Sequence, residues 1–167
     1  SRSIAALADV NVAAINYYFG GKNKVVNEAL KTIAQTLLLS FKHLDELSLP
    51  AEVRLRNCLY SYADYAILYP DVFRNFIDQI HHDPEASCEY IEFLRKNGLA
   101  KLKTVLKEIT GTEDENQLSM IIFQIFSCLE FPVLLGPRFN SLANFNYYDR
   151  DCRYRYSDLV IKSLVKN

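Results

Sequence analysis

The chain has 167 residues, half of them apolar, and a formal charge of −1, so its length fits one domain or a domain with a small module attached. Five glycines and five prolines are too few for the closely spaced turns of a β-sandwich or barrel. The balanced charge excludes a global field that attracts nucleic acid or acidic membranes, so a DNA-binding surface has to be a local patch.

The helical period of apolar residues runs through nearly the whole chain, which predicts an all-α fold. The first two helices are short, at residues 2–9 and 12–19, with Asn11 placed to cap the second and Gly20 to end it. Residues 136–148 show no clear period and are expected to form a loop. The remaining helices are expected at residues 22 to about 47, 51–69, 70 to about 82, 83 to about 109, 113 to about 135 and 150 to about 165.

The cysteines give no sign of a zinc site, because Cys58, Cys88, Cys128 and Cys152 include no C-x-x-C pair. In so apolar a chain we interpret them as buried thiols in a reducing compartment. The first residues do not resemble a signal peptide, and no window holds about 18 uninterrupted apolar residues. We therefore expect a cytoplasmic protein with no membrane partner.

The stretch IAALADVNVAAINYYFGGKNKVV, residues 4–26, joins two helices that are too short to be stable alone. Helices joined by about three residues are typical of the helix-turn-helix, whose second helix enters the DNA major groove. Ile4, Ala5 and Ala8 are expected to face inward from the first helix, and Ile15 and Phe19 from the second.

The residues expected to point outward suit DNA contact better than a merely solvated face. Apolar groups can meet thymine methyls, an asparagine can pair with an adenine edge, and tyrosine hydroxyls can reach phosphates. A lysine at the start of the next helix is a natural phosphate anchor. The expected DNA-binding residues are Asn11, Val12, Ala13, Asn16, Tyr17, Tyr18 and Lys22.

At these residues the sequence resembles the TetR family of bacterial transcriptional regulators, whose pattern is roughly I-A-x-x-A-G-V-S-x-x-x-[LI]-Y-x-[HY]-F-x-x-K-x-x-[LV]. Asp9 stands where glycine is usual in the turn, and Asn16 where tyrosine is frequent, with Tyr17 directly after it. Aspartate tolerates left-handed backbone better than most residues, so the turn is compatible with this change. The matching residues are Ile4, Ala5, Ala8, Val10, Ile15, Tyr18, Phe19, Lys22 and Val25.

The resemblance implies an N-terminal helix-turn-helix module at residues 1–25, incomplete because the family has a further helix before it. A helical ligand-binding and dimerisation domain at residues 26–167 is expected to follow. The implied function is a repressor that binds operator DNA as a homodimer and is released by a small apolar or aromatic effector.

The expected ligand cavity rests on the many aromatic residues of the middle helices, which supply more rings than an ordinary helical core needs. The residues expected to border it are Tyr62, Tyr65, Phe76, Phe93 and Phe126. The run of residues 120–126 is apolar almost all round its helix, which indicates burial on more than one side. With the apolar stripe of the last helix it suits a two-fold four-helix interface, which is where the family that the chain resembles dimerises. The alternative is a helix in the middle of a monomer core. The residues expected at the interface are Ile122, Phe126, Val160 and Leu164.

No catalytic motif, phosphate loop or metal-ligand spacing is present, so we expect neither an enzyme nor a cofactor or metal site. His81, His82 and Asp83 fit a solvated helix end better than a metal cluster. An alternative function is a helical small-molecule-binding or protein-interaction module with a vestigial DNA-reading head. Weak local basicity favours this alternative, because residues 1–47 hold five Lys or Arg against four Asp or Glu.

Overall fold

The computed structural model describes residues 2–21, 24–25, 28, 32, 35–71 and 95–165. Every regular element within these ranges is a helix and none is a strand, which confirms the predicted all-α class. The chain divides into two compact units, Ser1–Gln35 and Thr36–Asn167, called here the N-terminal and C-terminal units. The domain boundary predicted after residue 25 falls inside the first of them.

The N-terminal unit begins with α1 (Arg2–Leu7) and α2 (Val12–Phe19). The Asn11 side chain caps α2, because its Oδ1 accepts a hydrogen bond of 2.9 Å from the Ala13 amide. Gly20 ends α2 in the left-handed conformation that glycine adopts most easily, with φ of 71°. Asp9, in the turn, also has a positive φ of 51°, the conformation the family's glycine would allow.

A small core joins α1 to α2, and it is smaller than the sequence predicts. Ala5 and Ile15 are buried as expected, whereas Ala8 is exposed and Phe19 is only partly covered. The reason is geometric, since α1 and α2 have six and eight residues and each presents only about two turns to the other.

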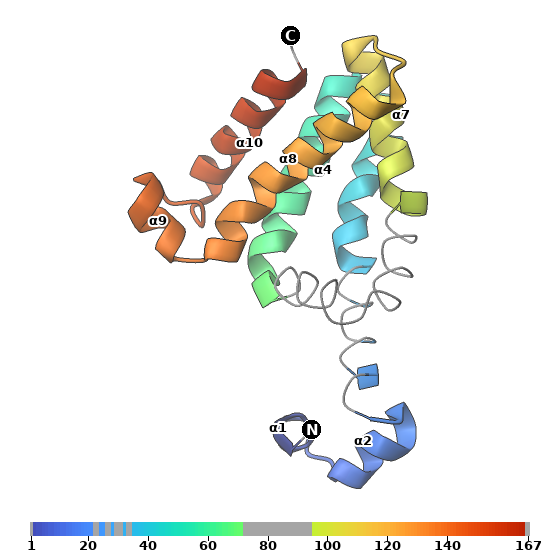
Figure 1. Ribbon diagram of the computed structural model, residues 1–167, viewed down its shortest axis with the longest axis vertical. Coiled ribbons are helices and arrows are strands. Elements are labelled where there is room, and N and C mark those ends of the chain that lie inside the picture. The colour runs from blue at the N-terminus through green and yellow to red at the C-terminus, as the bar shows by residue number, and fades with distance from the viewer. Residues whose placement is uncertain are drawn as a thin grey trace. The chain divides into compact units, whose positions relative to one another are not determined.

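The C-terminal unit is a helical bundle around α4 (Ala51–Leu68). Helix α4 packs against a 3₁₀ segment, η1 (Leu39–Asp45), and against α7 (Ala100–Thr110), α8 (Glu115–Leu135) and α10 (Arg150–Val165). Figure 1 shows α8 crossing α4 with α10 alongside. The fully buried core includes Leu55 and Leu59 of α4, Leu102 and Leu106 of α7, and Leu118, Ile125 and Leu129 of α8.

Three details of the chain trace differ from the sequence expectation. The expected loop at 136–148 contains a helix, α9 (Arg138–Ala143), whose six residues are too few for a period to register in sequence. The long helix expected to reach residue 47 becomes the 3₁₀ segment η1 from Leu39. A single π-helical turn, η2 (Arg95–Leu99), precedes α7, inside the helix expected from 83 to about 109. The part of that helix before residue 95, and most of the helix expected at 70 to about 82, lie outside the described residues.

Gly98 in η2 permits a close approach between η2 and η1. A Cβ built at this glycine would lie 3.1 Å from two ring atoms of Phe41. The Phe41 ring therefore packs directly against the backbone at Gly98, and this contact holds the start of α7 beside η1.

Helix α8 is long and apolar enough, by length and composition, to cross a membrane. A core helix of a bundle can have the same composition, and α8 packs against α4, α7, α9 and α10, with 39% of its most apolar window buried.

Polar contacts fasten α10 to α4. The buried Arg153 guanidinium donates from Nε to Asp64 Oδ1 at 2.9 Å and from Nη1 to the main-chain carbonyls of Tyr147 and Tyr148. The rings of Tyr60 and Tyr154 stack with centroids 3.9 Å apart. Each element thus contributes both an aromatic ring and a charge to this contact.

Candidate DNA-contacting helix and ligand groove

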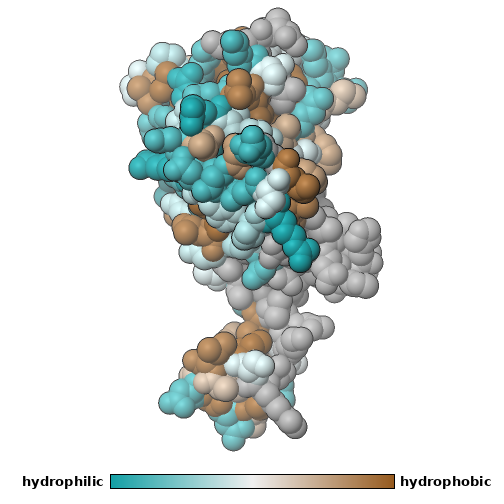
Figure 2. Space-filling model, turned by 90° about the vertical axis from the view of Figure 1, so that its left-hand side faces the viewer, coloured by the Kyte–Doolittle hydropathy of each residue, from teal (hydrophilic) through white to brown (hydrophobic). Residues whose placement is uncertain are grey.

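The outer face of α2 presents the residues that the sequence assigns to DNA contact. Tyr17 and Tyr18 are 84% and 78% exposed, and their rings meet edge to face with centroids 5.2 Å apart. Ala13 and Asn16 are exposed beside them, and Val12 is half-buried. Figure 2 shows apolar and polar side chains side by side on the visible face of the N-terminal unit.

The two asparagines of this helix have different hydrogen bonding. Asn11 uses Oδ1 for the helix cap, which leaves its Nδ2 group to donate elsewhere. The amide side chain of Asn16 makes no hydrogen bond to the described residues, so its donor and acceptor are both open to a base edge. Lys22 lies outside the described residues.

Charge is distributed unevenly between the two units. Residues 1–35 carry four Lys or Arg and two Asp or Glu, a net charge of +2. The rest of the chain carries 15 basic and 18 acidic residues, a net charge of −3. The positive excess therefore lies in the unit that holds α2, although it is small.

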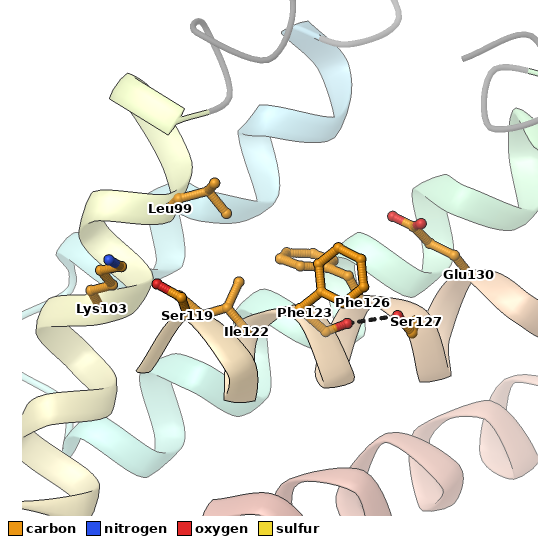
Figure 3. A pocket seen from close by; sticks show the side chains of 8 residues that line it. All are labelled: Leu99, Lys103, Ser119, Ile122, Phe123, Phe126, Ser127 and Glu130. Carbon is orange, nitrogen blue, oxygen red and sulfur yellow. Dashed lines mark hydrogen bonds between the residues drawn. The ribbon is translucent and has the colours of Figure 1, made fainter. Parts of the chain in front are cut away.

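A groove of about 300 Å³ runs along α8 where α7 packs beside it (Figure 3). Ser119 and Glu130 both line it and are eleven residues apart on one helix, so the groove is roughly 16 Å long. Its walls are mostly apolar. The lining residues are Leu99, Lys103, Ser119, Ile122, Phe123, Phe126, Ser127 and Glu130.

Two of the aromatic residues predicted to border a ligand cavity are brought together at this groove. Phe126 lines it, and the buried ring of Tyr62 lies against Phe126 with centroids 4.8 Å apart. Phe41 of η1 contacts both rings, with centroids 6.3 Å away from each. Tyr65 is half-buried on α4 and is not part of the lining, while Phe76 and Phe93 lie outside the described residues.

Glu130 is the lining residue that sequence reasoning missed. The Tyr62 hydroxyl donates a hydrogen bond of 2.6 Å to Glu130 Oε1, and this bond favours the charged form. Burial has the larger and opposite effect and raises the pKa of Glu130 to about 7. The sequence does distinguish Glu130, because it is the one charged residue between Leu118 and Leu135.

Lys103 at the other end of the groove already has a charged partner. Its Nζ lies 2.8 Å from Oε2 of Glu115, at the first turn of α8. Lys107 also contacts Glu115, and the two lysines lower the pKa of that carboxyl to about 2. Lys103 therefore offers the groove mainly its aliphatic stem.

The residues predicted for the dimer interface are mostly internal to the C-terminal unit. Ile122 and Val160 are only 5% and 6% exposed, Phe126 faces the groove, and the Leu164 side chain is not among those described. The same two helices do expose other large apolar side chains. These are Met120, Phe123 and Phe131 of α8 and Leu159 of α10.

No group of three or more potential metal ligands occurs within the described ranges, and the His81–His82 pair lies outside them. Comparison of the chain with protein-family models, with curated proteins and with solved structures finds no match.

Proposed function

We propose that this protein is a transcriptional regulator that resembles the TetR family, binds operator DNA as a homodimer through α2, and responds to a small ligand in the α7–α8 groove. The observation that carries the proposal is the arrangement of α1 and α2. A capped helix follows a left-handed turn at Asp9, packs against α1, buries Ile15, and leaves Asn16, Tyr17 and Tyr18 exposed.

The exposed chemistry of α2 supports DNA as the partner. Two adjacent exposed tyrosines are unfavourable for a solvated helix, because each leaves a large apolar ring in water. The same side chains can reach phosphates with their hydroxyls, and Asn16 can form a bidentate pair with an adenine. The net charge of +2 in the N-terminal unit adds a modest attraction to the phosphate backbone.

Dimerisation is supported by the exposed apolar side chains of α8 and α10. Met120 is 65% exposed on α8, and Leu159 is 63% exposed on α10. A second copy of the chain would cover these residues by a two-fold contact between equivalent helices. Two copies are also what the reading of two DNA half-sites requires.

A path for ligand response runs through η1. Phe126 lines the groove and touches Phe41 of η1, and η1 continues the helical residues 35–38 that lead back to the N-terminal unit. A ligand that moves Phe126 would displace Phe41 and shift the segment attached to it. The size of its effect on DNA affinity is set by how much more tightly the ligand binds one conformation of the protein, DNA-bound or DNA-released, than the other.

A fluorescence anisotropy titration with duplex DNA at several salt concentrations tests the proposal. Lys22→Ala is expected to weaken binding to all sequences and to reduce the salt slope by about one. Asn16→Ala is expected to lose discrimination at one base pair, by roughly 1–3 kcal/mol. Identical behaviour of the two variants would contradict this division of contacts.

The second candidate is a helical small-molecule-binding module whose DNA-reading head is vestigial. The weakness of the positive charge favours it, because a net charge of +2 in the N-terminal unit gives little attraction to DNA. Binding of ligands in the groove together with no salt-dependent DNA binding would select this candidate.

A further inference from the structure

We propose that the α7–α8 groove selects an apolar ligand with one positive charge, held by an ion pair with Glu130 at one end of an aromatic wall. The inference rests on the groove being the effector site of the proposed function, and it adds the chemical class of the effector. The expected ligand is a small amine that carries one or two aromatic or aliphatic rings.

Glu130 is the acidic residue of the groove. Glu130 lines the groove, and its Oε1 accepts from the Tyr62 hydroxyl. No cation forms an ion pair with Glu130 within the described residues. A carboxylate in such a place is costly, and a cationic group that pairs with it would recover part of that cost.

Lys103 does not take this role. Its Nζ is paired with Glu115, fifteen residues before Glu130 on the same helix, which corresponds to roughly 22 Å along α8. This separation exceeds the Debye length of about 8 Å at physiological salt. Figure 3 likewise shows Lys103 and Glu130 at opposite ends of the lining residues.

The rest of the groove lining suits the apolar body of such a ligand. Phe123, Phe126 and Ile122 lie between the two ends, and aromatic faces attract a cation as well as an apolar body. A volume of about 300 Å³ lies at the lower end of the range for ligand pockets. A small elongated amine therefore fits both the length and the walls of the groove.

Proton binding should be linked to ligand binding. The ionisable groups near Glu130 on other elements are Tyr62 of α4 and Tyr147, which precedes α10, whereas Lys103 of α7 lies at the far end of the groove. Glu130 has a pKa of about 7, so its charged fraction rises from about one-tenth at pH 6 to about nine-tenths at pH 8. Affinity for an amine that stays protonated should rise several-fold over this interval.

The test uses three probes of one shape in calorimetric titrations of the full chain: 4-phenylbutylamine, 4-phenylbutan-1-ol and 4-phenylbutanoate. At pH 8 the amine should bind about tenfold or more tightly than the alcohol, and the carboxylate should bind weakest. In Glu130→Gln, which keeps an acceptor for Tyr62, the affinity for the amine should fall to the affinity for the alcohol. The affinity for the alcohol should stay within about twofold of wild type.

A second variant guards against a folding defect in Glu130→Gln. Tyr62→Phe removes the hydrogen bond that favours the charged form of Glu130, so the preference for the amine should appear at a higher pH. Equal binding of amine and alcohol to wild type at pH 8 would overturn the charge preference and leave the groove as an effector site. Binding of none of the three would refute both the charge preference and the groove as effector site, while the DNA titration above tests the reading helix separately.

Discussion

The hydroxyl of Tyr156 donates a hydrogen bond of 3.2 Å to the main-chain carbonyl of Cys128, which is the carbonyl that Pro132 leaves without its usual helical donor. Proline has no amide hydrogen, so residue 132 cannot donate to the carbonyl four positions earlier. The ring of Tyr156 also stacks on Phe145, with centroids 5.6 Å apart. Helix α10 therefore supplies the hydrogen-bond donor that the Cys128 carbonyl of α8 lacks within its own helix.

Tyr156→Phe should lower the free energy of unfolding by about 1 kcal/mol, because it removes the hydroxyl donor and retains the ring. In a Pro132→Ala background an alanine amide can donate to Cys128, so the same change should cost clearly less. Urea denaturation of the four proteins of this cycle measures the difference. An equal cost in both backgrounds would show that the hydroxyl does not substitute for the missing amide.

The stability of the protein should depend on pH through Glu130. Its pKa is about 7 in the folded protein against an ordinary value of 4.5, so the folded state holds the proton more tightly. Below pH 4.5 the group is protonated in both states. As pH rises from 4.5 to 7 the unfolded state ionises first, and wild type loses stability, by an amount on the order of 3 kcal/mol.

Glu130→Gln removes this loss and should become more stable than wild type as pH rises. Unfolding at pH 5 and pH 8, for wild type and for the variant, gives the comparison. A stability difference that does not change between the two pH values would contradict the raised pKa.

The cap of α2 can be tested separately from its DNA contacts. Asn11→Ala removes the acceptor for the Ala13 amide and should cost about 1 kcal/mol of helix stability, with weaker DNA binding as a consequence. Asn11→Ser keeps a capping oxygen and serves as the matched control. Circular dichroism and DNA titration of both variants are the measurements, and equal losses for serine and alanine would exclude capping as the role of Asn11.

The proposed dimer surface predicts a contrast between two nearby residues. Met120→Glu places a charge on an exposed position and should give a folded monomer, whereas Ile122→Glu buries a carboxylate and should unfold or precipitate the chain. Thr104→Glu, at an exposed position on α7, is the control that should leave the assembly unchanged. Light scattering that finds an unaltered dimer for folded Met120→Glu would place the interface elsewhere.

Features set by neighbouring residues could be predicted from the sequence. Asn11 and Gly20 mark the ends of α2, and Asp114 caps α8 through hydrogen bonds to the Asn116 and Gln117 amides. Gly111 ends α7 in a left-handed conformation. These signals act over two to four residues, which is why these particular helix ends lie close to the predicted ones.

Features set by tertiary packing could not be predicted. Glu130 and its partner Tyr62 are 68 residues apart, and no local pattern joins them. Ile122 and Phe123 illustrate a second reason. Helix α8 is apolar on almost all sides, so its sequence has no polar stripe to tell which residue faces the core.

Selection of protein-bound fragments from a randomised duplex library, at about 100 mM salt, tests the central claim most directly. The account predicts enrichment of a two-fold symmetric sequence by the wild-type chain, with half-sites about 10 base pairs apart or a multiple of it. It also predicts that Asn16→Ala broadens the preference at one position of each half-site and leaves the spacing unchanged. Recovery of unenriched DNA, or the same enriched sequence from wild type and from a variant with Asn16→Ala and Tyr17→Ala together, would contradict DNA reading by α2.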